Sequence, residues 1–108
     1  MIKQIINIVN KWKVIVYYNI DYNLFSVIKR DLHSILLTNN TIDRIEYKMK
    51  HKAKAVTISN FKFRTTIVLF NKHKSNVDYI NSIVHESEHI KQDILQYYKI
   101  KDYGEDPI

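Results

Sequence analysis

The hydrophobic and polar positions of this chain follow two different periods, which predicts a mixture of helices and strands. Apolar residues at helical spacing predict a short amphipathic helix over residues 2–10. The β-branched and aromatic run at 14–18 predicts a buried strand. Asp21 or Asn23 can then cap a helix over residues 23–37, where apolar side chains again recur at helical spacing.

The middle of the chain has the shorter period that is typical of strands. A polar loop over 38–41 is followed by alternation at 42–48 and again at 53–59. Residues 65–70 form a third β-rich run, and residues 60–64 connect it to the run before. Because these runs are short and closely spaced, they favour an antiparallel meander.

The last part of the chain predicts its longest helix, over residues 76–99. The segment 75–78 resembles a capping box, and the helix is expected to fade before Gly104. One stripe of its side chains is expected to face the core: Val77, Ile80, Val84, Ser87, Lys91, Ile94 and Tyr98. Together these elements predict an α+β fold of one domain, residues 1–108, with helices packed on a short, mostly antiparallel sheet.

Composition narrows the classes of protein to which this chain can belong. Its 108 residues are enough for about one domain. The absence of cysteine excludes disulfides and thiolate metal sites, so that a metal must be bound by His, Asp or Glu. No apolar run approaches the length of a membrane span, and the N-terminus lacks the pattern of a secretory signal. We therefore expect a protein of the cytoplasm, in a bacterium or a phage-infected host cell, with no membrane partner.

The net charge of +6 permits binding to an acidic partner, including nucleic acid. The basic residues are spread along the chain, however, and their densest cluster, at 48–54, is expected in a turn between strands. No helix-turn-helix, zinc-finger or RNA-recognition signature accompanies this cluster. A basic surface exposed to solvent is therefore favoured over a nucleic-acid site.

The predicted long helix contains the sequence His85-Glu86-Ser87-Glu88-His89, which has the pattern H-E-x-x-H. On a helix, residues four apart lie on the same face, so His85 and His89 can bind one zinc ion. Glu86 lies one step round the helix, where it can take a proton from a zinc-bound water. The alternative is a solvated helix with two surface histidines and an ion-pairing glutamate, and the charged Glu88 is in keeping with that alternative.

Two histidines make an incomplete zinc site, because catalytic zinc usually has three protein ligands and a water. No histidine follows His89, so the candidates are carboxylates: Asp93, Asp102, Glu105 and Asp106. Asp93 is one turn beyond His89 and is better placed to accept a hydrogen bond from it. Asp106 and Pro107 have the pattern of a helix start, and a helix that ran back from there could bring Glu105 to the zinc.

The order of short strands, an H-E-x-x-H helix and a following glutamate resembles the gluzincin branch of the zincin metallopeptidases. Residues 75–108, which include the motif and the segment 103–107, are similar to small H-E-x-x-H proteins of tailed bacteriophages. The resemblance implies that zinc is bound by His85, His89 and Glu105, and that Glu86 is the general base. It also implies that the strand ending at Phe70 aligns the substrate and that Tyr103 polarises the scissile carbonyl.

The sequence departs from the zincin pattern at its end, because the family has a further helix and lobe where this sequence stops at Ile108. We expect a small zincin-like fold in which that lobe is missing. The expected function is a zinc-dependent metallopeptidase that cleaves peptides or proteins. One alternative is a zincin-like phage structural or binding protein, associated with the virion and without catalytic activity. The other is a basic, nucleic-acid-associated protein in which the motif is accidental.

Overall fold

A computed structural model of the chain describes residues 1–8 and 11–105, with side chains described as far as Lys99. The structure is an α+β fold in which three helices pack on a four-stranded sheet, as the sequence predicts. Its strands are β1 (Ile2–Ile8), β2 (Trp12–Tyr18), β3 (Ala55–Asn60) and β4 (Thr65–Phe70). Its helices are α1 (Phe25–Ser34), α2 (Asn39–His51) and α3 (Asn76–Glu105), with 3₁₀ turns at Tyr22–Leu24 and Phe61–Phe63.

The strand order in the sheet is β1-β2-β4-β3, which makes β3 an edge strand. β1 pairs with β2 and β3 with β4 as antiparallel neighbours, and β2 pairs with β4 in parallel. The sheet is therefore mostly antiparallel, but the meander expected from the close spacing of the strands is wrong. Parallel strands need a long crossover connection, and α1 and α2 lie within the connection from β2 to β4.

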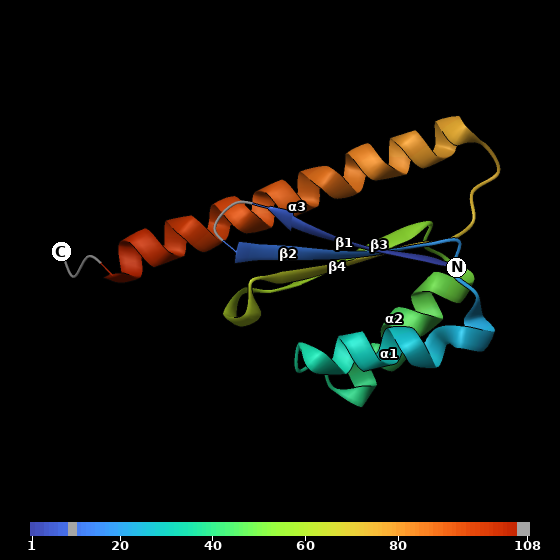
Figure 1. Cartoon of the computed structure of the whole chain (residues 1–108), viewed down its shortest axis with the longest axis horizontal. Helices are drawn as coiled ribbons and strands as arrows, with labels where there is room; N and C mark the ends of the chain where they lie inside the picture. Colours follow the sequence, from blue (N-terminus) through green and yellow to red (C-terminus); the bar gives the residue numbers. More distant parts are fainter. Residues whose placement is uncertain (9–10, 106–108) are drawn as a thin grey trace.

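The helices form a layer on each face of the sheet, with α1 and α2 below it and α3 above it in Figure 1. Alternate residues of the central strands face opposite ways, as the strand period of two requires. The core under α1 and α2 includes Ile15, Tyr17, Ile67 and Leu69. The core under α3 includes Trp12, Val14, Val16, Val68 and Phe70. Every residue of β4 is buried, because helices cover both of its faces.

Residues 42–48 are helical and not the strand that their alternation predicts. The buried residues of α2 are Ile42, Ile45 and Met49, whose spacing is that of one face of a helix. Thr38 caps this helix, since its hydroxyl accepts a hydrogen bond of 3.3 Å from the backbone N–H of Thr41. Tyr47 lies off this face and is 59% exposed.

Residues 2–8 form an edge strand and not the helix that their apolar spacing predicts. β1 pairs with β2 along its whole length, with Ile5 opposite Ile15. Isoleucine is β-branched, so it suits a strand when a partner strand is present. Ile2, Ile5 and Ile6 remain 58%, 54% and 38% exposed, because no helix covers this edge of the sheet closely.

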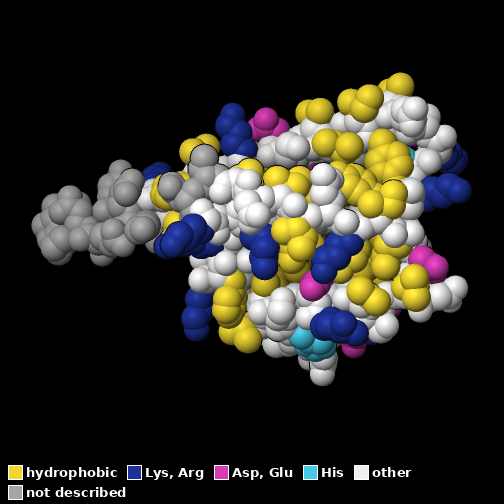
Figure 2. Space-filling view, in the orientation of Figure 1, with side chains coloured by type: hydrophobic (Ala, Val, Ile, Leu, Met, Phe, Trp, Pro, Cys, Tyr) yellow, Lys and Arg dark blue, Asp and Glu magenta, His cyan; other side chains and the backbone are white. Residues whose placement is uncertain are grey.

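The apolar stripe of α3 that was expected to face the core is exposed in its first half. Val77, Ile80 and Val84 are 65%, 58% and 58% exposed. Figure 2 shows hydrophobic side chains gathered over this half of α3. The face that packs on the sheet carries Tyr79, Ile90, Ile94 and Tyr97, of which Ile94 belongs to the expected stripe. The aromatic contacts favour this rotation of the helix, with the Tyr97 ring edge-on to Trp12 at 5.4 Å between centroids.

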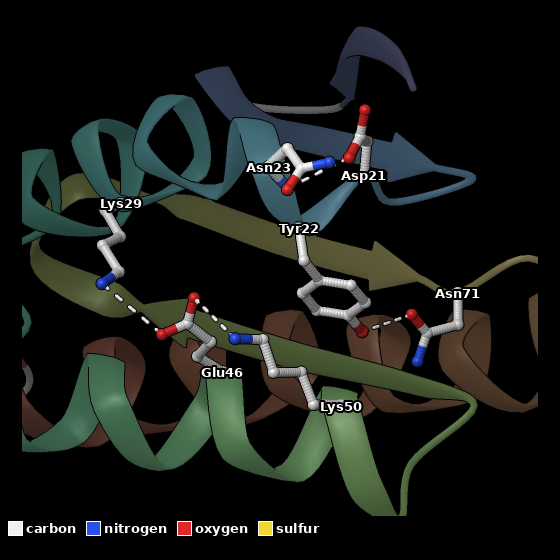
Figure 3. A network of polar contacts seen from close by, with 7 residues as sticks. All are labelled: Asp21, Tyr22, Asn23, Lys29, Glu46, Lys50 and Asn71. Carbon is white, nitrogen blue, oxygen red and sulfur yellow. Dashed lines mark hydrogen bonds and ion pairs between the residues drawn. The ribbon is translucent and has the colours of Figure 1, made fainter.

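A polar network ties α1, α2 and the end of β4 together (Figure 3). Glu46 of α2 forms ion pairs with Lys29 of α1, at 3.5 Å, and with Lys50, at 3.8 Å. The phenol of Tyr22 donates a hydrogen bond of 2.5 Å to the side-chain oxygen of Asn71. The Asn71 amide in turn donates to the backbone oxygens of Met49 and Ala53, at 2.6 and 2.9 Å. Asn71 therefore fixes the C-terminal end of α2 beside the start of β3.

We expect Asn71→Ala to lower the free energy of unfolding by about 2–3 kcal/mol, because three hydrogen bonds lose a partner. Urea unfolding followed by circular dichroism measures this loss. The matched control is Asn40→Ala, an exposed position in the first turn of α2, for which a change within about 0.5 kcal/mol is expected. Equal stabilities of the two variants would contradict the role given to Asn71.

The phenol of Tyr17 makes the folded state sensitive to alkaline pH. Burial, together with the hydrogen bond that it donates to Asp31, raises the pKa of Tyr17 well above its usual value. The folded protein therefore keeps a proton that the unfolded chain releases near pH 10, and the free energy of unfolding falls as the pH rises past about 10. Tyr17→Phe removes this contribution, so its urea midpoint should fall less steeply with pH. Parallel pH profiles for the variant and the wild type would refute the assignment.

Candidate functional site

The two histidines of the H-E-x-x-H motif converge on one side of α3. The Nε2 atoms of His85 and His89 are 3.2 Å apart. Their rings meet edge-on, with centroids 4.8 Å apart and an interplanar angle of 85°. Both side chains are exposed, so that solvent and solutes can reach the space in front of the two nitrogens.

The separation of these nitrogens fits two ligands of one tetrahedral zinc. Zinc–nitrogen distances of about 2.0–2.1 Å and a tetrahedral angle of about 109° place two ligand nitrogens about 3.3–3.4 Å apart. The observed 3.2 Å between the Nε2 atoms of His85 and His89 is close to that value. The separation is therefore compatible with a shared zinc, and it also matches a hydrogen bond between the two rings.

Glu86 points towards the sheet and not into solvent. Its side chain is only 7% exposed, and its carboxylate accepts a hydrogen bond from the hydroxyl of Thr57 on β3. A buried carboxylate needs such a partner, because burial without a hydrogen bond is costly. Glu86 is thus held at the edge of the sheet, one residue along the helix from His85. It is not an exposed glutamate that forms a surface ion pair, as the alternative of a solvated helix requires.

Asp93 is also held by the sheet, and not by His89 as the sequence suggests. Its carboxylate accepts a hydrogen bond of 2.7 Å from the hydroxyl of Ser59. The Ser59 hydroxyl is 2.8 Å from that of Thr66, which accepts a bond of 2.9 Å from the indole N–H of Trp12. Thr57 and Ser59 were not singled out in the sequence, although their spacing of two places both on the face of β3 that meets α3.

The third ligand is not found among the side chains that the structure describes, since no three His, Asp or Glu residues there could share a metal ion. The expected break in the helix near Gly104 is absent, and the backbone of α3 continues to Glu105. A straight helix rises about 1.5 Å per residue, which puts the backbones of His89 and Glu105 about 24 Å apart along its axis. The side chains of Asp102, Tyr103 and Glu105, and all of Asp106 and Pro107, lie outside the description, so Glu105 as a ligand remains a prediction.

A groove runs past these residues along the free edge of β3, between α3 and the end of α2. One hollow of about 350 Å³ is lined by Lys48, Thr57, His85, His89 and Asp93, among others. A second, of about 360 Å³, adjoins it and shares Ala55, His85 and Glu86 with it. The strand beside the motif is therefore β3, and the expectation that the strand ending at Phe70 forms this edge is wrong. That strand, β4, lies between β2 and β3.

Comparison with protein-family models, with curated proteins and with solved structures finds no match for this chain. Within the part of the chain that the structure describes, no helix combines the length and apolar character needed to cross a bilayer.

We expect the protein to bind zinc through His85 and His89. Either His85→Ala or His89→Ala should therefore weaken the affinity for Zn²⁺ at least about tenfold, because each variant removes one of the few ligands. Competition with a chromophoric chelator measures this affinity. The matched control is His33→Ala, an exposed histidine on α1, on the other face of the sheet, which should bind zinc like the wild type. Unchanged affinity in both motif variants would contradict the site.

Proposed function

We propose that this protein is a zinc-dependent hydrolase that cleaves peptide bonds in extended polypeptides. The observation that carries the proposal is the 3.2 Å separation of the His85 and His89 Nε2 atoms on the wall of a groove that Glu86 also lines. An H-E-x-x-H hydrolase needs the two histidines and the glutamate in one place, and all three line the same hollow.

Each residue has a separate role in the proposed reaction. His85 and His89 would hold the zinc, which would polarise the scissile carbonyl and make water more acidic. Glu86 accepts a proton from the attacking water at its carboxylate and returns it to the leaving amine. The Thr57 hydroxyl donates to the Glu86 carboxylate and so fixes its orientation, which makes Thr57 a positioning residue.

The edge strand supports a peptide as the substrate. Within residues 1–8 and 11–105, β3 pairs with β4 alone, so the backbone groups of its other side face the groove. An extended peptide can pair with such an edge through its main chain, which binds it without regard to most of its side chains. The groove passes Thr57, Glu86 and the histidine pair, so that a peptide lying in it meets the proposed catalytic groups.

A second candidate is a binding protein that uses the same groove without cleaving its ligand, as in a phage structural or inhibitory protein. The absence of a third metal ligand among the described side chains favours it. The two candidates share the groove and the edge strand. They differ in whether Glu86 transfers a proton.

Glu86→Gln separates the two candidates. The zinc-loaded wild type should degrade an unfolded protein such as reduced casein, and the variant should bind zinc normally but cleave about 10²–10⁴-fold more slowly. The control is Glu88→Gln, an exposed carboxylate two residues away, which should cleave at the wild-type rate. Mass spectrometry of the fragments gives both rate and cut sites. A zinc-loaded wild type that leaves the casein intact favours the binding protein.

A further inference from the structure

The groove beside the histidine pair continues past the start of β3 into a strongly basic hollow. This third hollow, of about 420 Å³, is lined by Ala53, Lys54 and Asp78 and by the loop residues 71–74. It shares Lys54 and Asp78 with the hollow that contains His85 and Glu86. A polypeptide that followed β3 would therefore pass from the proposed catalytic groups directly into it.

The charges along this groove are uneven. Three lysines, Lys54, Lys72 and Lys74, line the hollow at the start of β3, against one carboxylate, that of Asp78. At the other end, the hollow is lined by one lysine, Lys48, and by two carboxylates, those of Glu86 and Asp93.

The lysines of the basic hollow are not neutralised by the carboxylates that the structure describes. The ion pairs among the described residues join Lys3 to Asp31, and Lys29 and Lys50 to Glu46. Neither Lys54, Lys72 nor Lys74 takes part in any of them. Three exposed lysines that line one hollow make its local potential positive, which attracts an anionic ligand.

We propose that the substrates of this site are peptides with acidic side chains on the C-terminal side of the cleaved bond. The inference rests on the proposed function and adds the class and direction of its substrate. Because antiparallel pairs are the commoner arrangement, a peptide added to β3 runs from the Asn60 end towards Ala55. The part that follows the cleaved bond then enters the basic hollow.

The register gives the position of the acidic residues. Because Thr57 is hydrogen-bonded to Glu86, the cleaved bond should lie opposite Thr57 on β3. Lys54 lies three residues before Thr57 in the sequence. A strand advances about 3.3 Å per residue, so the first acidic side chain should lie about three residues beyond the one opposite Thr57.

A peptide fits the groove better than nucleic acid does. Proteins that bind single strands stack the bases on aromatic side chains. The residues that line the three hollows include no Phe, Tyr or Trp, although they include His73, His85 and His89. The free edge of β3, in contrast, offers hydrogen-bonding groups at the spacing of an extended peptide.

The test measures binding separately from cleavage. A fluorescent twelve-residue peptide with four glutamates in its C-terminal half is titrated into zinc-loaded Glu86→Gln protein, and anisotropy is followed. We expect it to bind about fivefold to tenfold more tightly than the same peptide with glutamines, because each lysine contributes a modest, screened attraction. The double variant Lys54→Glu/Lys72→Glu should lose this preference.

Matched controls separate a specific groove from a generally basic surface. The variant Lys11→Glu/Lys62→Glu makes the same charge change at the opposite end of the sheet and should keep the preference. Equal binding of the two peptides, or a preference that survives Lys54→Glu/Lys72→Glu, overturns the proposal. A single-stranded oligonucleotide that displaces the acidic peptide at equal concentration and equal salt overturns it in favour of a nucleic-acid groove.

The direction of the peptide is tested by the cut sites in unfolded casein. Asp and Glu should be enriched about three residues to the C-terminal side of the cut, and enrichment on the N-terminal side overturns the orientation. If the protein prefers the acidic peptide but cleaves nothing, the hydrolase is wrong and the acidic ligand stands. If it cleaves casein without any such preference, the hydrolase stands and the acidic substrate is wrong.

Discussion

The packing of α3 on the sheet determines where every residue of the candidate site points. Tyr79, Ile90, Ile94 and Tyr97 lie on the buried face of this helix, and Glu86 falls between them at the same helical spacing. The carboxylate therefore has to be buried, and the hydroxyl of Thr57 provides the hydrogen bond that makes its burial possible. Once Glu86 faces the strand, the neighbouring turns of the helix carry His85 and His89 outwards, where their Nε2 atoms meet.

The connectivity of the sheet gives this arrangement its groove. Because the chain crosses through α1 and α2 before it returns to the sheet, β3 is added outside β4 and keeps one edge free. The Asn71 side chain, bonded to the backbone of Met49 and Ala53, holds the end of α2 against that edge. The lysines around the start of β3 would attract the acidic chains that we propose as ligands.

Much of the fold was predictable from local pattern. The strands near 14–18, 53–59 and 65–70 and the helix within 23–37 are found where the apolar and β-branched runs place them. The two segments whose secondary structure was predicted wrongly, residues 2–8 and 42–48, share one cause, which is that short apolar segments fit both periods. Ile42, Ile45 and Met49 serve equally as a broken alternation or as a helical face. The isoleucines of β1 have helical spacing, yet they pair with β2, because a partner strand outweighs local preference.

The sequence by itself determined that His85 and His89 share a helix face with Glu86 beside them, because a helical pattern fixes the relative angle of residues one and four apart. It also determined the class of the fold, since the segments that form helices and strands have distinct compositions. Only the tertiary structure decided which way that helix face turns, which strand is the free edge, and which lysines line the groove. Those outcomes depend on contacts between distant segments, such as Thr57 with Glu86 and Asn71 with Met49, which no local pattern encodes.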